Sequence, residues 1–142
     1  MIDYSKYIGI DYKLGGRSIK EGLDCYGLVL EFYKNEYGII LPDFKGVFSD
    51  ARTRTMHGTD GKNLKDVYDE SMQEEFFEVE DSKEGDILAF TLSGVPIHLG
   101  IRIDDFLMLH TFKEGSTSCI EQYRGFKWEK RFYGAYRHKN LM

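Results

Sequence analysis

The chain has 142 residues, a length that suits one globular domain with its own hydrophobic core. Hydrophobic residues at 42% and aromatic residues at 15% exclude a disordered chain. The net charge of −5 argues against general nucleic-acid binding, and no apolar run approaches the roughly 20 residues that span a bilayer. We therefore expect one domain over residues 1–142, with no nucleic-acid partner and no membrane span.

The N-terminal region predicts a short helix followed by a turn. Residues 2–10 would place Tyr4, Tyr7 and Ile8 on one side of a helix. Charged residues lie among the apolar ones, which excludes a cleaved signal peptide. We therefore expect a protein that works in the cytoplasm or reaches its site by a route without such a signal. Residues 11–16 end in two glycines, which let another segment approach closely.

The clearest helix signal covers residues 24–37. Apolar side chains recur at helical spacing, at Leu28, Val29, Phe32, Tyr33 and Tyr37. Asp24 is expected to cap the N-terminus of this helix and Gly38 to end it. Cys25 then lies in the first turn, where the helix dipole favours a thiolate. The alternative is a small buried thiol that fills a gap in the core.

The middle of the chain predicts an irregular segment and a second helix. Residues 44–62 are polar and broken by glycines, and their His57 is expected to lie on the surface. Residues 63–76 predict a helix that begins at Asn63, with one apolar face and one acidic face. The sequence leaves open whether residues 44–62 form a lid.

Charge is distributed unevenly along the chain. Residues 60–86 hold 11 acidic and 3 basic side chains, whereas residues 113–142 hold 7 basic and 3 acidic ones. Such segments usually form solvated faces, and contact of the basic segment with an anionic partner is the alternative hypothesis. The two cysteines, Cys25 and Cys119, are expected to be free thiols because they are few and far apart.

From residue 85 onward the hydrophobic pattern changes to the period of a strand. Strands are predicted over residues 86–90, 97–103, 106–112, 120–123 and 132–137. The second of these alternates cleanly and places Ile97, Leu99, Ile101 and Ile103 on one face. Helices followed by an antiparallel meander predict an α+β fold.

His98 and His110 lie 12 residues apart on the two strands of a predicted hairpin. A two-residue turn would put them on opposite faces, whereas a three-residue connection over 103–105 pairs residue 102 with 106 and residue 98 with 110. Directly opposed side chains have Cβ atoms roughly 4.5–5.5 Å apart, close enough for a hydrogen bond between two imidazoles. We therefore predict an odd-length or bulged turn that places both histidines on one face.

Cys25, His98 and His110 together indicate nucleophilic chemistry. A cysteine nucleophile needs a thiolate, a base beside it and a third group that orients the base, and these three residues can fill those places. A lone strand histidine is more often structural, so the hypothesis depends on the combination. The same side chains are also zinc ligand types, although the sequence suggests no fourth ligand.

Five stretches of the chain resemble motifs of the NlpC-type cell-wall peptidases, a papain-like family of bacterial and phage cysteine endopeptidases. They are residues 9–16, 22–29, 85–90, 98–101 and 108–110. The resemblance implies a papain-like α+β fold, with N-terminal helices packed on a central antiparallel sheet of about five strands. The order of cysteine before histidine argues against the circularly permuted acyltransferase relatives.

The resemblance also implies roles for four residues. Cys25 is the nucleophile, His98 is the general base and His110 orients His98. Tyr12 lies beside the cysteine and helps to hold the oxyanion, for which the backbone amide of Cys25 is a further donor. The resemblance implies neither a cofactor nor a metal.

The implied substrate is peptidoglycan, cleaved in its stem or cross-bridge peptides through a thioester acyl-enzyme, with D,L-endopeptidase activity as the leading choice. The alternatives are an N-acetylmuramoyl-L-alanine amidase and a structural tail-assembly protein with a vestigial site. The family commonly has serine after the nucleophile, where this chain has Tyr26. An aromatic residue there resembles members found in phage tails. We therefore expect synthesis in the cytoplasm, followed by a place in a virion tail among other tail proteins or delivery to the cell wall.

Overall fold

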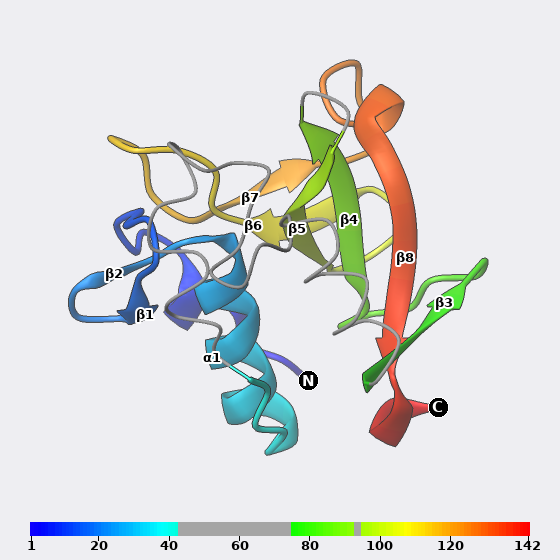
Figure 1. Ribbon diagram of the computed structural model, residues 1–142, viewed down its shortest axis with the longest axis horizontal. Coiled ribbons are helices and arrows are strands. Elements are labelled where there is room, and N and C mark those ends of the chain that lie inside the picture. The colour runs from blue at the N-terminus through cyan, green and yellow to red at the C-terminus, as the bar shows by residue number, and fades with distance from the viewer. Residues whose placement is uncertain (43–74, 93–94) are drawn as a thin grey trace, which may run out of the picture.

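A computed structural model of the protein describes residues 1–42, 75–92 and 95–142 (Figure 1). The predictions for residues 44–62, including His57, and for the start of the second helix at Asn63 lie outside these ranges. The described elements in chain order are η1 (Tyr4–Tyr7), β1 (Arg17–Ser18), β2 (Gly22–Leu23), α1 (Cys25–Tyr37), β3 (Phe76–Val79), β4 (Ile87–Leu92), β5 (Val95–Arg102), β6 (Leu107–His110), β7 (Cys119–Gln122), η2 (Glu129–Arg131), β8 (Phe132–His138) and η3 (Lys139–Leu141).

Six of the described strands form one antiparallel sheet with the order β3-β8-β4-β5-β6-β7. Strands β4 to β7 form the predicted meander, but β8 does not continue it. Instead β8 returns to the far side of β4 and pairs with both β4 and β3 (Figure 1). The expectation of about five strands missed β3, because Phe76 was assigned to the end of a helix. Phe76 is buried against the rings of Tyr33 and His138 and begins a strand.

Helix α1 has the predicted bounds and caps. The carboxylate of Asp24 accepts a hydrogen bond from the amide of Gly27 at 2.8 Å, and Gly38 ends the helix in the left-handed region with φ of 66°. The predicted N-terminal helix is only the short 3-10 turn η1, so the described N-terminal region has one α-helix rather than several. In the described ranges we find no helix with the length and apolar character needed to cross a bilayer.

The alternation of side chains on β4 and β5 divides the core into two layers. On the helix side, Leu99 and Ile101 pack with α1, together with Ile87, Ala89 and Leu109 of the neighbouring strands. The other face packs against a second cluster, made of Leu88, Phe90, Met108, Tyr123, Trp128 and Ala135. His98 and His110 have the parity of this second face, and the rings of Phe90 and Trp128 in the second cluster lie next to His98.

The hairpin between β5 and β6 has the predicted parity but a different register. Ile101 pairs with Leu109 and Arg102 pairs with Met108, so the predicted pairing of residue 102 with 106 is wrong by two positions. The cause is the turn at Asp104, whose carboxylate accepts from the amides of Phe106 and Leu107 at 2.8 Å each. The connection still has odd length, and both histidines therefore share one face.

Candidate active site

Cys25 is the first residue of α1, and its neighbours hold the helix start firmly in place. Besides capping the helix, Asp24 accepts from the amide of Gly15 at 2.9 Å and pairs with Arg17 at 2.8 Å. Burial raises the pKa of the Asp24 carboxyl, and Arg17 and the backbone amides partly offset this. This buried and hydrogen-bonded cap therefore fixes the position of Cys25 at the start of the helix.

Two glycines allow the N-terminal loop to pack directly on this helix start. A Cβ atom at Gly27 would lie 2.2 Å from the carbonyl oxygen of Gly16, and one at Gly16 would lie 2.2 Å from the carbonyl oxygen of Gly22. Neither position has room for a side chain. The prediction that the paired glycines permit a close approach is therefore confirmed at Gly16, where the backbone of Gly22 approaches, and Gly27 in turn lets the carbonyl of Gly16 contact the first turn of α1.

Tyr12 is held beside the same helix start. It forms an isolated parallel bridge with Leu23, two residues before the cysteine, and its amide donates to the carbonyl of Ser116. Tyr12 also lines a surface pocket together with Phe112. The ring of Phe112 in turn lies 5.1 Å from the ring of His98. Tyr12 therefore lies in a position between the cysteine segment and the histidine face.

His98 is enclosed by aromatic rings. It is 2% exposed and stacks on Trp128, with ring centroids 4.8 Å apart and an interplanar angle of 22°. Phe90 and Phe112 pack against its other sides. These contacts restrict the rotation of the imidazole about its side-chain bonds and exclude water from most of it.

A hydrogen-bond chain joins His98 to two further side chains. Nε2 of His98 lies 2.9 Å from Nδ1 of His110, and Nε2 of His110 lies 2.7 Å from Oε1 of Glu121. An ionised carboxylate only accepts, so His110 carries its proton on Nε2 and offers a lone pair at Nδ1. His98 must then donate from Nε2, which leaves its Nδ1 as the nitrogen with a lone pair. We call His98, His110 and Glu121 the relay.

Burial decides the charge state of the relay histidines at rest. Burial holds the pKa of His98 well below 6.5, and the charges of His110 and Lys127 act in the same direction. The pKa of His110 is also lowered by burial, which the bond to Glu121 partly offsets. Burial alone would raise the pKa of Glu121, but the hydrogen bond from His110 together with nearby positive charge lowers it. Near neutral pH the relay is therefore two neutral imidazoles and one carboxylate.

The structure brings two of the four predicted residues into direct contact and places Cys25 on the helix that packs against the strand of His98. The predicted contact between His98 and His110 is confirmed. Cys25 is partly buried against the helix-side core, which includes Leu99 of β5, and α1 packs on β5. The direct approach of the Cys25 thiol to Nδ1 of His98 stays a prediction.

Tyr26 turns out to be part of the core. It is 4% exposed, and its hydroxyl donates to the carbonyl of Pro42 at 2.6 Å. The guanidinium of Arg17 lies over its ring at 5.5 Å from the centroid. Tyr26 therefore ties the chain after α1 back to the helix start, and its bulk is directed into the protein.

Sequence reasoning missed two residues of this site, Glu121 and Trp128. Glu121 lies on a predicted strand, but its place beside His110 follows from the pairing of β6 with β7, which sequence does not reveal. Trp128 lies between strands and has no periodic signal of its own. The clue available was that it is the single tryptophan of the chain.

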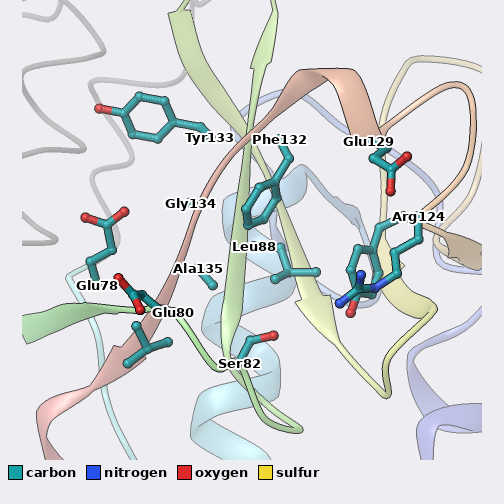
Figure 2. Close-up of a pocket in the computed structure, with 12 residues that line it drawn as sticks. Glu78, Glu80, Ser82, Leu88, Arg124, Glu129, Phe132, Tyr133, Gly134 and Ala135 are labelled. Carbon is teal, nitrogen blue, oxygen red and sulfur yellow. The ribbon is translucent and has the colours of Figure 1, made fainter.

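A separate pocket of about 390 Å³ lies along β8 and β3 (Figure 2). Glu78 and Glu80 lie at one end, Arg124 and Glu129 lie at the other, and Leu88 lies between them. Its described lining includes neither a histidine nor a cysteine. We therefore place the candidate chemistry at Cys25 and the relay rather than in this pocket.

One group of side chains in the described ranges combines three metal-ligand types. Ligand atoms of His110, Cys119 and Glu121 all lie within 4.8 Å of one another. Cys25 and His98 do not belong to this group, so the arrangement differs from the zinc site considered from sequence. Neither Cys25 nor Cys119 forms a disulfide.

Comparison with known proteins finds related sequences and structures. The model of the NlpC/P60 family matches residues 9–137, which is most of the chain. The murein DD-endopeptidase MepS/murein LD-carboxypeptidase of Escherichia coli strain K12 is 24% identical over 140 residues. That alignment covers 96% of this chain and 60% of the relative, so the chain spans about three fifths of the length of this protein.

Solved structures share the fold. The NlpC/p60 domain of the peptidoglycan hydrolase SagA superimposes with a TM-score of 0.59 at 20% identity, covering 93% of this chain and 90% of that one. An NlpC/P60 family protein from Bacillus cereus gives a TM-score of 0.63 at 20% identity, with 93% and 36% covered. The predicted papain-like α+β fold is confirmed.

The burial of the relay makes stability depend on pH. In the unfolded chain His98 and His110 take up protons near pH 6.5, whereas burial lowers their folded pKa values. The unfolded state therefore binds more protons as pH falls below about 6.5, and stability is lost in that direction. Each histidine contributes a slope of at most about 1.4 kcal/mol per pH unit. Urea denaturation from about pH 7.5 to pH 5 measures this loss. A His98→Gln variant should show a shallower loss, and an equally steep one would contradict the assignment.

Proposed function

The chain belongs to the NlpC/P60 family, and on that premise we propose that it is a cysteine hydrolase that cleaves peptide bonds of peptidoglycan. The observation that carries this proposal is the relay, which leaves Nδ1 of His98 as a base while Cys25 opens a helix that packs on the same strand. The names of the relatives, a murein endopeptidase and a peptidoglycan hydrolase, support the choice of substrate.

The proposed reaction begins with the thiol of Cys25. His98 takes its proton at Nδ1, and the thiolate attacks a peptide carbonyl to form a tetrahedral intermediate. Tyr12 and the backbone amide of Cys25 stabilise the oxyanion. The protonated His98 then gives its proton to the leaving amine, and water hydrolyses the resulting thioester. No cofactor takes part in these steps.

Glu121 is proposed as a positioning residue that acts through His110. When His98 becomes positive during the reaction, the carboxylate of Glu121 supplies a counter-charge at the far end of the relay. Its acceptor-only character also keeps both imidazoles in the tautomer that the reaction requires. Trp128, stacked on His98, keeps the base from rotating away.

The bond that is cleaved is a finer part of the proposal. D,L-endopeptidase cleavage of the stem peptide is the leading choice, and amidase cleavage at the junction of sugar and peptide is the alternative. The name of the Escherichia coli relative adds D,D cross-links and L,D bonds to the candidates. These products differ in mass, so fragment analysis distinguishes them.

We also propose that the protein works in a phage tail. Supporting this are the resemblance around Tyr26 and that of residues 31–42, 128 and 134–138 to tail-associated members of the family. Tyr26 is buried and hydrogen-bonded, so an aromatic residue at this position also has a structural role that does not depend on a phage particle. Mass spectrometry of purified virions from a producing strain should detect the protein, and its absence from intact particles would contradict a tail location.

The hydrolase proposal is tested by digestion of purified cell wall. The wild-type protein should release muropeptide fragments, and Cys25→Ala should lower the rate at least about a thousandfold because the nucleophile is gone. Cys119→Ala removes the other thiol and should digest normally. Equal release by wild type and Cys25→Ala would exclude a cysteine mechanism, and no release by either would favour a structural protein with a vestigial site.

The role of Glu121 is tested by Glu121→Gln. A neutral amide replaces a charge-assisted hydrogen bond, so we expect kcat to fall roughly tenfold with little change in KM. The acidic limb of the pH–rate profile should move to lower pH, because the carboxylate no longer raises the pKa of His110. Glu129→Gln, a change outside the relay, serves as the control. A purely structural role would leave the pH profile of the folded Glu121→Gln protein unchanged.

A further inference from the structure

We propose that His110, Cys119 and Glu121 form a binding site for a zinc-like divalent ion at the outer end of the relay. Binding of the ion does not depend on catalysis, and only the inhibitory effect of the ion rests on the proposed function. The three ligand types are an imidazole, a thiol and a carboxylate, a combination that suits zinc better than magnesium or calcium.

The pairing of β6 with β7 creates this group. Residue 110 lies directly opposite Cys119, and Met108 lies opposite Glu121. Cys119 and Glu121 are two residues apart on one strand, so their side chains project from the same face of the sheet as His110. Three ligands are thus held by backbone pairing on two rigid strands.

The distances and the accessibility allow an ion to bind. Ligand atoms around tetrahedral zinc lie roughly 3.5 Å apart, and the three atoms here already lie within 4.8 Å of one another. Cys119 is exposed and Glu121 is half-buried, so an ion can enter from the side of β7, the outermost strand on this side of the sheet. Water would complete the coordination.

Lys127 opposes the ion and provides a sharp test. Its ammonium lies 4.0 Å from Oε2 of Glu121, and its charge repels a cation placed among these ligands. Removal of this charge should therefore tighten metal binding, whereas removal of a ligand should weaken it. General loss of structure would weaken metal binding in every variant. It cannot explain tighter metal binding in the Lys127 variant together with weaker binding in the ligand variants.

Metal binding would reverse the tautomers of the relay. The ion displaces the proton of His110 Nε2 and that of the Cys119 thiol, and both protons pass to solvent. The proton on His98 Nε2 then moves to His110 Nδ1, and His98 takes one proton from solvent at its own Nδ1. Nδ1 of His98 becomes a donor, so it cannot accept a proton from Cys25. Zinc at this site therefore inhibits the reaction without touching the nucleophile.

The binding test uses Cys25→Ala protein, in which Cys119 is the only thiol. Equilibrium dialysis with zinc should give one ion per chain, and cobalt(II) should give a thiolate-to-metal charge-transfer band. Adding Cys119→Ser should remove the band and weaken binding 10- to 100-fold, whereas Lys127→Gln should strengthen binding. Glu75→Gln, which alters the separate His138–Glu75 pair at 2.9 Å, should change neither. Equal affinity with and without Cys119, or no effect of Lys127→Gln, would overturn the site.

Inhibition is measured separately, on wall digestion by otherwise wild-type protein. Zinc should inhibit the wild type reversibly, and Cys119→Ala should digest at the normal rate and resist zinc at the same concentration. Loss of zinc binding in the dialysis experiment rejects the metal site alone, whereas lack of digestion in the absence of zinc rejects the hydrolase. Equal zinc sensitivity of wild type and Cys119→Ala would show that zinc acts at Cys25 instead.

Discussion

The hydrogen-bond chain from Glu121 through His110 to His98 is the constraint on which the rest of the site depends. Each member comes from a different strand, and the two bonds of 2.9 Å and 2.7 Å fix where every proton of the chain lies. A slip of one residue between β5 and β6 would place His110 on the helix side of the sheet and break both bonds. The turn at Asp104 therefore contributes to the chemistry, because it sets this register.

Burial determines how the relay responds to a positive charge on His98. His98 lies among Trp128, Phe90 and Phe112, so a lone positive charge there is costly. The carboxylate of Glu121 supplies a counter-charge, and it is linked to His98 through His110. Glu121 thus stabilises the charged form of His98, which arises during the reaction, and not the neutral form that is present before it. The aromatic enclosure and the carboxylate therefore have complementary effects.

Local signals made much of this fold predictable, and non-local pairing accounts for the rest. The bounds of α1 follow from Asp24, Gly38 and helical spacing, all within a short segment. The shared face of His98 and His110 follows from the predicted odd length of the connection between their strands, which the observed register has. The exact register did not follow, because it depends on which amides the Asp104 side chain accepts from. Glu121 could not be found at all, since its neighbour across β6 and β7 is set by strand pairing.

The two halves of the site are built in different ways, and strand β5 joins them. The cysteine half uses residues close in sequence, with Asp24, Arg17 and the glycine loop packed around the start of α1. The histidine half uses side chains from three successive strands, β5, β6 and β7, which backbone pairing holds side by side. The last member of the relay lies on β7, an outermost strand that also carries the exposed Cys119, so an ion can reach this end of the relay from solvent. An ion that binds at that end can change the base while leaving Cys25 untouched.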